Sequence, residues 1–213
     1  MTATTTNAQA SDIYQTLDSN VQCYTGTASE VTTQCNGKCC VGNEACSHWS
    51  GDGINTVCEA SCIGDRSCKH LSGRGRLVIR TQSCVGVGAC RDLEVGSPGS
   101  NNHVISAGSC RGRWACYDTR AANLLHIGIG SCIGEGSCSS MFHATSGIGD
   151  TISIGDRSCI GDNACEYYTA RHDLSHSILV DNNECVGEDS CSNCDDALFP
   201  RDNLYHLASS VCE

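Results

Sequence analysis

Short segments in which apolar and polar residues alternate recur along the chain, and most end five residues before a cysteine. Alternation with a period of two is the pattern of a β-strand that buries one of its faces. Each segment has a pair of positions two residues apart that face the same side, and in two segments the first of these is polar, Asn55 or His103, so that only the second is apolar. The complete pairs are Leu77 and Ile79, Leu125 and Ile127, Ile152 and Ile154, Ile178 and Val180, and Tyr205 and Leu207. The chain is therefore predicted to form a series of short strands.

A seven-residue motif, C-x-G-x-x-x-C, occurs seven times along the same stretch. Ile or Val precedes the glycine in six of the seven copies, Arg111 being the exception, and Ser or Ala precedes the second cysteine in all of them. Three residues after the second cysteine comes another mostly apolar position, occupied by Trp49, Leu71, Leu93, Thr119, Met141, Tyr168 and Cys194. Each unit therefore provides short strands separated by a glycine-marked bend, with an inward side chain on each strand.

The spacing of the motifs predicts how the units stack. Their first cysteines are 22, 22, 26, 22, 27 and 26 residues apart, and a base unit with small insertions is typical of a solenoid. Period-two alternation and frequent glycine oppose a helical repeat. We predict an all-β fold: a parallel β-helix (β-solenoid) of about seven coils of 22–27 residues, stapled by disulfides and with capped ends. With coils about 4.8 Å apart it would be roughly 34 Å long.

Open solenoid ends expose strand edges and core side chains, so caps are expected at both ends. Residues 1–39, which are rich in Thr and polar residues, are predicted to form an N-terminal tail and cap. Residues 40–191 are assigned to the repeats and residues 192–213 to a C-terminal cap.

The two cysteines of one motif can be bonded only if the chain bends between them. On one extended strand they would lie about 20 Å apart, beyond the roughly 4.4 to 6.8 Å between Cα atoms that a disulfide allows. Bonding between equivalent cysteines of stacked coils is the alternative, but it leaves one of seven without a partner. We therefore favour pairing within each coil, which uses Cys40 and Cys46, Cys62 and Cys68, Cys84 and Cys90, Cys110 and Cys116, Cys132 and Cys138, Cys159 and Cys165, and Cys185 and Cys191.

Six other cysteines lie towards the two ends of the repeat region. Cys194 and Cys212 are predicted to staple the C-terminal segment. A zinc site at residues 35–40 is disfavoured because the paired C-x-x-C knuckles of structural zinc sites do not occur. The remaining four would tie down the N-terminal segment in a pairing that the sequence leaves open: Cys23, Cys35, Cys39 and Cys58.

Composition indicates the compartment in which the protein is found and restricts its binding partners. The chain has 20 cysteines in 213 residues, a load typical of proteins from an oxidising compartment. No secretory signal is visible at its start, so we expect a mature fragment whose location is extracellular or at the cell surface. No apolar run approaches the length of a membrane span. A net charge of -11 with 13 basic residues argues against nucleic acid as a partner.

The units SCIGDRSC at 61–68, SCIGEGSC at 131–138 and SCIGDNAC at 158–165 share the form S-C-x-G-x-x-[AS]-C. They resemble the repeats of secreted or surface proteins of diatoms and related algae, and the likeness covers residues 40 to about 191. The resemblance implies a cysteine-stapled solenoid with no assigned activity. The six-residue cysteine offset is also similar to that of beetle antifreeze solenoids. Their outward threonine array is missing here, so ice binding is only a minor alternative.

Two groups of residues are candidates for a site. Glu135, Asp162 and Glu188 follow the motif glycine in three units and would form an acidic ladder with steps of about 4.8 Å. Such a row suits a calcium ion or paired catalytic carboxylates, although a solvated turn is the interpretation we favour. Tyr167 and Tyr168 lie in an enlarged coil and could stack on sugar rings.

Motifs for nucleophilic catalysis or nucleotide binding do not occur in the sequence. We therefore predict a non-enzymatic extracellular module with a structural, adhesive or surface-binding role. It requires no cofactor, with calcium as an optional ligand, and its expected partner is extracellular matrix, wall polysaccharide or another surface protein. The second hypothesis is a carbohydrate-binding or carbohydrate-cleaving β-helix that uses the acidic row.

Overall fold

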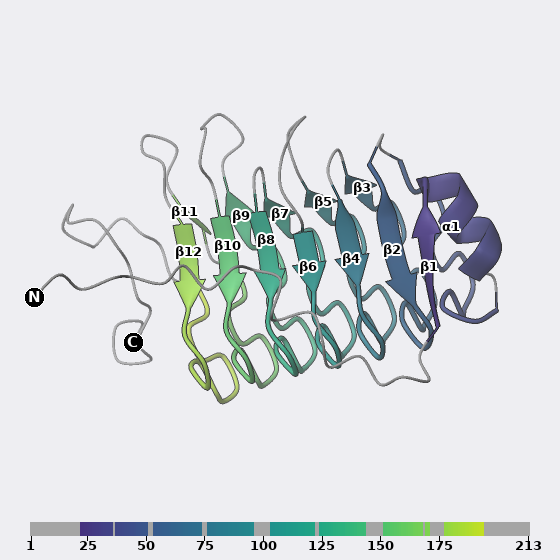
Figure 1. Cartoon of the computed structure of the whole chain (residues 1–213). Helices are drawn as coiled ribbons and strands as arrows, with labels where there is room; N and C mark the ends of the chain where they lie inside the picture. Colours follow the sequence, from purple (N-terminus) through teal and green to yellow (C-terminus); the bar gives the residue numbers. More distant parts are fainter. Residues whose placement is uncertain are drawn as a thin grey trace, which may run out of the picture.

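The computed structural model of the chain describes residues 22–35, 37–50, 53–73, 76–95, 103–121, 124–143, 151–167, 169–170 and 177–193. In these residues the fold is a parallel β-solenoid with one short helix at its N-terminal end (Figure 1). The elements are β1 Cys23–Gly26, α1 Ala28–Cys35, β2 Asn55–Cys58, β3 Ser72–Gly73, β4 Leu77–Ile79, β5 Glu94–Val95, β6 His103–Ile105, β7 Arg120–Ala121, β8 Leu124–Ile127, β9 Phe142–His143, β10 Thr151–Ile154, β11 Thr169–Ala170 and β12 Ser177–Val180. The predicted all-β solenoid is confirmed.

Successive units pair in register on three sides of the solenoid. The long sheet has the order β1-β2-β4-β6-β8-β10-β12, with β1 antiparallel to β2 and every other neighbouring pair parallel. Shorter parallel sheets join β3, β5 and β7 on one side and β9 and β11 further along. A third ladder of single bridges runs through the residue before each motif glycine: Val41, Ile63, Val85, Arg111, Ile133, Ile160 and Val186.

The core lies between these ladders and is filled by the inward positions that the alternation predicts. All eight complete-pair residues that the structure describes are buried: Leu77, Ile79, Leu125, Ile127, Ile152, Ile154, Ile178 and Val180. Asn55 and His103 occupy the same inward row and are also buried, although they are polar. Leu71, Leu93 and Met141 fill the row after the second cysteine. Residues 205 and 207 lie outside the described part.

All 18 described cysteines form disulfides, nine in number. Each motif is closed within its own coil, with Cα–Cα distances of 5.5 to 5.8 Å. Seven of the disulfides are these motif pairs: Cys40–Cys46, Cys62–Cys68, Cys84–Cys90, Cys110–Cys116, Cys132–Cys138, Cys159–Cys165 and Cys185–Cys191. The predicted partners Cys194 and Cys212 lie outside the described residues.

The bend inside each motif has an alternating backbone. In the unit that starts at Cys84, every second residue from Gln82 to Asp92 has a positive φ. A residue other than glycine in this conformation costs roughly 1–2 kcal/mol, so the motif is held by its surroundings rather than by local preference. Backbone hydrogen bonds to both neighbouring coils supply part of this support, because the amides of Gly86 and Cys90 donate to Ile63 and Ala115, respectively.

Close stacking requires the motif glycine in six of the seven units, the exception being Gly187, where an added Cβ atom would meet only Ser190 Cβ at 4.0 Å. At Gly112, φ is 142° and a Cβ atom would lie 2.2 Å from the carbonyl oxygen of Gly134 on the next coil. No real side-chain carbon occupies such a position. The glycine therefore permits both the bend and the approach of adjacent backbones.

At the N-terminal end, β1 and α1 lie against the first parallel strand (Figure 1). The sequence pattern did not predict α1. The helix begins with a capping box, in which the Thr27 amide donates to Glu30 Oε2 at 2.9 Å and the Glu30 amide donates to the Thr27 hydroxyl at 3.4 Å. The hydrogen bonds that the Thr27 amide and the Thr27 hydroxyl donate to the Glu30 carboxylate, both of 2.9 Å, lower the pKa of Glu30.

Two disulfides join the elements of this N-terminal end, and they settle the pairing that the sequence left open. Cys23–Cys58 ties β1 to β2, and Cys35–Cys39 closes the end of α1. The described residues contain no helix long and apolar enough to cross a membrane.

Candidate functional site

The structure places the predicted acidic row of Glu135, Asp162 and Glu188 in the exposed bends, where Glu135 and Asp162 have structural partners. Asp162 Oδ1 accepts a hydrogen bond of 2.8 Å from the amide of Glu135 on the preceding coil. Glu135 in turn lies 3.7 Å from the guanidinium of Arg113. Asp65 and Asp156 make the same kind of bond to the coil before them. Acids in these bends thus connect neighbouring coils, as the solvated-turn interpretation allows.

Glu135, Asp162 and Glu188 are not brought together as a three-ligand cluster. Among the described residues, the groups that place three ligand atoms within 4.8 Å of one another consist of cysteines alone. Those cysteines are bonded in disulfides, so their sulfurs are not the thiolates that metal ions bind. The geometry therefore provides no further support for calcium at the acidic row.

The predicted tyrosine site is only partly visible. Tyr167 is exposed, with 52% of its surface accessible, and follows the second cysteine of its motif by two residues. Tyr168 lies outside the described residues, so the pair remains a prediction.

A different feature, a polar groove of about 430 Å³, lies on the side of the solenoid that carries β3, β5 and β7. It belongs to the units that start at Cys62, Cys84 and Cys110. The residues that line it are His70, Ser72, Asp92, Glu94, Tyr117, Asp118 and Arg120.

Two outward rows form the floor of this groove. His70, Asp92 and Asp118 follow the second cysteine of their motifs by two residues. Ser72, Glu94 and Arg120 come two residues later and are paired in register across β3, β5 and β7. The position between the rows points inward and is buried in all three units, so the two rows share one face.

Backbone hydrogen bonds hold the first row in place. The amides of His70, Asp92 and Asp118 each donate to a carbonyl oxygen on the preceding coil, at 2.9 Å in every case. The spacing along the row is visible where His48 precedes His70, because their ring centroids lie 4.8 Å apart. The groove therefore presents a regular series of side chains on a fixed frame.

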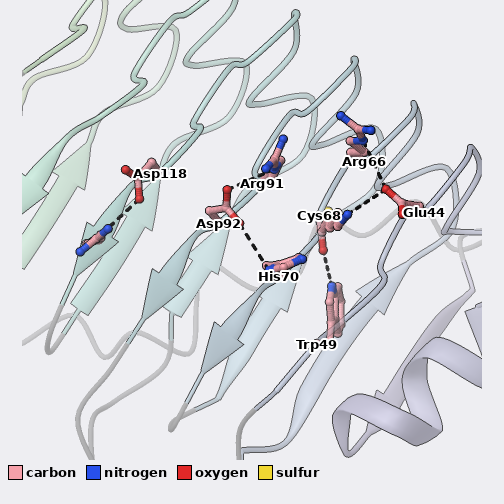
Figure 2. A network of polar contacts seen from close by, with 10 residues as sticks. Glu44, Trp49, Arg66, Cys68, His70, Arg91, Asp92 and Asp118 are labelled. Atoms are coloured by element: carbon pink, nitrogen blue, oxygen red, sulfur yellow. Dashed lines mark hydrogen bonds and ion pairs between the residues drawn. The ribbon is translucent and has the colours of Figure 1, made fainter.

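Each aspartate of the groove has a basic neighbour (Figure 2). Asp92 lies 3.1 Å from Nε of Arg91 and 3.8 Å from Nδ1 of His70. Asp118 lies 3.2 Å from Nε of Arg120, which also lines the groove. The groove thus combines carboxylate acceptors with guanidinium and imidazole groups.

An aromatic pair with an arginine lies along one edge of the groove. The rings of Trp114 and Tyr117 meet edge to face, with centroids 5.1 Å apart. The guanidinium of Arg91 lies 5.7 Å from the Tyr117 ring and 5.9 Å from the Trp114 ring. Both aromatic side chains are only partly buried, and Tyr117, unlike Trp114, lines the groove, whose surface is mainly polar.

A second polar cluster continues towards the N-terminal end and has a structural role. Glu44 lies 2.8 Å from Lys69 Nζ and 3.2 Å from Arg66 Nε, and the hydrogen bond from Lys69 lowers the pKa of Glu44 most (Figure 2). Trp49 Nε1 donates to the carbonyl oxygen of Cys68 on the next coil. These contacts join neighbouring coils rather than enclose a cavity.

Sequence reasoning missed the groove, although one signal was present. The prediction that the third position after each second cysteine points inward implies that the second and fourth positions point outward. Applying that rule would have placed Asp92 and Asp118 in one row, with Glu94 and Arg120 beside them. The variation of residue type from coil to coil hid this arrangement.

Comparison of the chain with protein-family models, with curated proteins and with solved structures finds no match. The groove and the disulfide framework therefore provide the basis for a functional proposal.

Proposed function

We propose that this protein is a non-enzymatic extracellular module with a structural or adhesive role, which presents a rigid surface to matrix, wall polysaccharide or another surface protein. The observation that carries the proposal is the disulfide inside every motif that the structure describes. Disulfides persist in oxidising compartments, which supports a secreted or cell-surface location. The likeness of the motifs to repeats of algal surface proteins agrees with this proposal.

The proposal includes a rod of seven coils of 22–27 residues. The single-bridge ladder from Val41 to Val186 supports this count, because each motif contributes one residue to it. A rod of stacked coils has a fixed spacing of side chains along its length, which suits contact with an extended partner. In this role, the disulfides limit unfolding where no cellular machinery repairs the protein.

The alternative hypothesis, a carbohydrate-cleaving β-helix, predicts that the protein releases reducing ends from a polysaccharide. The purified, disulfide-intact protein should be incubated with insoluble wall and matrix polysaccharides, and both the sedimented protein and the released reducing ends should be measured. We expect the protein to sediment with one of these materials and to release no reducing ends. Release of reducing ends would overturn the non-enzymatic proposal, and failure to sediment with any wall or matrix material would overturn the surface-binding one.

A further inference from the structure

We propose that the groove lined by His70, Asp92 and Asp118 binds a neutral, extended β-1,4-linked glycan chain. The inference rests on the proposed surface-binding function and names the ligand of that surface. It also places recognition away from the acidic bends and away from Tyr167.

The hydrogen-bonding groups of the groove match the hydroxyl groups of a sugar. Each sugar hydroxyl donates one hydrogen bond and accepts others, so it is best satisfied between an acceptor and a donor. The Asp118 and Arg120 pair, which lines the groove, offers a carboxylate and a guanidinium 3.2 Å apart. On the neighbouring coil the groove offers the carboxylate of Asp92, which lies 3.1 Å from Nε of Arg91 behind the lining. Hydrogen bonds to ionised groups are stronger than those between neutral groups.

The charge of the groove favours a neutral ligand over a charged one. Three carboxylates, those of Asp92, Glu94 and Asp118, line the groove together with the guanidinium of Arg120 and the imidazole of His70, and Arg91 lies beside Asp92. A polyanion would meet the three carboxylates and a chain of net charge -11. A divalent cation would have to compete with the arginines, and the described acids form no three-ligand cluster.

The aromatic edge provides the second feature of a sugar site. The axial C–H groups of a pyranose ring form an apolar face, and aromatic side chains bury such faces at little entropic cost. Tyr117 lines the groove, and its contacts with Trp114 and Arg91 hold the ring in place. A ligand without an apolar face would leave this surface unused.

The regular spacing of the coils selects an extended chain. Equivalent rings of His48 and His70 lie 4.8 Å apart, and the groove continues through the next two units. This step is close to the advance of one sugar unit in an extended β-1,4-linked chain. Successive sugars would therefore lie over successive coils, with the same sugar face presented at every second coil because consecutive units of such a chain are turned over relative to each other. Because the backbone of the row is fixed by hydrogen bonds to the preceding coils, binding would order little of the protein.

The test uses the full disulfide-intact chain and isothermal titration calorimetry. The probes are cellohexaose, mannohexaose and chitohexaose, with oligogalacturonate as the acidic comparison and calcium chloride alone as the cation comparison. We expect at least one neutral hexasaccharide to bind more tightly than oligogalacturonate. Preferential binding of the acidic oligosaccharide, or binding of no neutral hexasaccharide at millimolar concentration, would overturn the inference.

Variants locate the binding in the groove. Asp118→Asn removes a charged acceptor and should weaken binding about tenfold or more, and Tyr117→Ser should weaken it similarly because the ring is lost. Tyr117→Phe keeps the ring and should retain most of the affinity. Glu188→Gln changes an exposed carboxylate outside the groove and should leave affinity unchanged. Melting temperatures of all variants show whether each is folded.

The outcome also separates this inference from the proposed function. If the wild-type protein and Asp118→Asn sediment equally well with wall material, while neither binds a neutral hexasaccharide, the glycan inference fails and the surface-binding function stands. If neither protein sediments and no hexasaccharide binds, both fail. Equal affinities of the wild-type protein, Asp118→Asn and Tyr117→Ser for the bound hexasaccharide would also overturn the groove assignment.

Discussion

His103 Nδ1 accepts a hydrogen bond of 3.1 Å from the backbone amide of Leu125 in the inward row of the long sheet. His103 occupies the position that Leu77 holds on the preceding coil, and its side chain has no exposed surface. An imidazole that accepts through Nδ1 is neutral there, with its proton on Nε2. Burial lowers the pKa of His103 from 6.5 to about 4.

This pKa shift makes the stability of the protein dependent on pH. Between pH 6.5 and about 4 the unfolded chain binds a proton at His103 that the folded chain does not, so the free energy of unfolding decreases as pH falls through this window. The free energy of unfolding decreases by at most on the order of 3 kcal/mol through this group, and the decrease is complete only below about pH 4. His126, whose pKa is lowered mainly by burial, contributes in the same direction. We expect the melting temperature to fall steeply across this window.

Two substitutions separate the charge of His103 from its hydrogen bond. His103→Gln keeps an acceptor for the Leu125 amide but cannot be protonated, so the pH dependence above about pH 5 should flatten to the part that His126 provides. His103→Leu should flatten it equally but lower stability at pH 7 by about 1–3 kcal/mol, because the amide is left without its acceptor. Melting curves from pH 4 to 8 measure both. An unchanged pH dependence in His103→Gln would contradict this account.

Two glycines of one coil allow the cost of close stacking to be measured. Gly112→Ala should prevent folding or lower stability by more than about 3 kcal/mol, since its Cβ would lie 2.2 Å from the Gly134 oxygen. Gly108 also has a positive φ, of 70°, but a Cβ atom added there would meet nothing within 4 Å. Gly108→Ala should therefore cost only about 1 kcal/mol. Denaturant unfolding compares the two, and equal losses would show that backbone strain, rather than stacking, requires the motif glycine.

The framework could be predicted from the sequence because its determinants repeat in every unit. A buried residue such as Ile127 or a glycine such as Gly134 has the same surroundings in each coil, so the same residue type recurs and the spacing becomes visible. The pairing of the N-terminal cysteines needed geometry as well. The sequence pattern did not predict helix α1, because the repeat does not extend to that segment. Thr27 and Glu30 nevertheless have the spacing of a capping box.

The groove could not be predicted in the same way, because its residues do not repeat. His70, Asp92 and Asp118 occupy equivalent positions but differ in type, and Tyr117 and Arg120 come from a single unit. Some of their contacts depend on the stacking of one coil on the next: His70 contacts Asp92, and Arg91 contacts Tyr117, across more than 20 positions of the sequence. In a solenoid, residues that differ between units thus form the binding surface, whereas residues that the units share determine the fold.

Disulfides at different places along the solenoid should contribute unequally to the free energy of unfolding. Replacing Cys110 and Cys116 by Ala removes a seven-residue loop closure, which is about 2 kcal/mol in the chain-entropy model. Sulfur atoms of this disulfide lie within 4.8 Å of those of Cys90 on one side and of Cys132 and Cys138 on the other, so the truncation also leaves a cavity between packed coils. We expect a total loss of about 3–5 kcal/mol.

The matched control is the double substitution of Cys185 and Cys191 by Ala. Its loop has the same length, but in the described residues its sulfur atoms come within 4.8 Å of a disulfide on one side only. The loss should therefore stay nearer the loop-closure value. Guanidinium unfolding under non-reducing conditions gives both free energies, and equal losses would mean that packing between disulfides contributes little.

At the small residue before each second cysteine, we expect stability to depend on the size of the side chain rather than on its polarity. Ser137 is fully buried, and its hydroxyl donates to the carbonyl oxygen of Cys159 on the next coil at 2.7 Å. That oxygen also accepts the Ile133 amide, and Ala115 and Ala164 occupy the equivalent buried position in neighbouring units. Ser137→Ala should therefore change stability by less than about 1 kcal/mol, because no polar group loses its last partner. Ser137→Val should lower stability by about 1–3 kcal/mol, since two methyl groups must fit between stacked coils where serine has one hydroxyl. Thermal unfolding of both variants at pH 7 measures the difference, and a larger loss in Ser137→Ala than in Ser137→Val would show that the hydrogen bond, not the space, restricts this position.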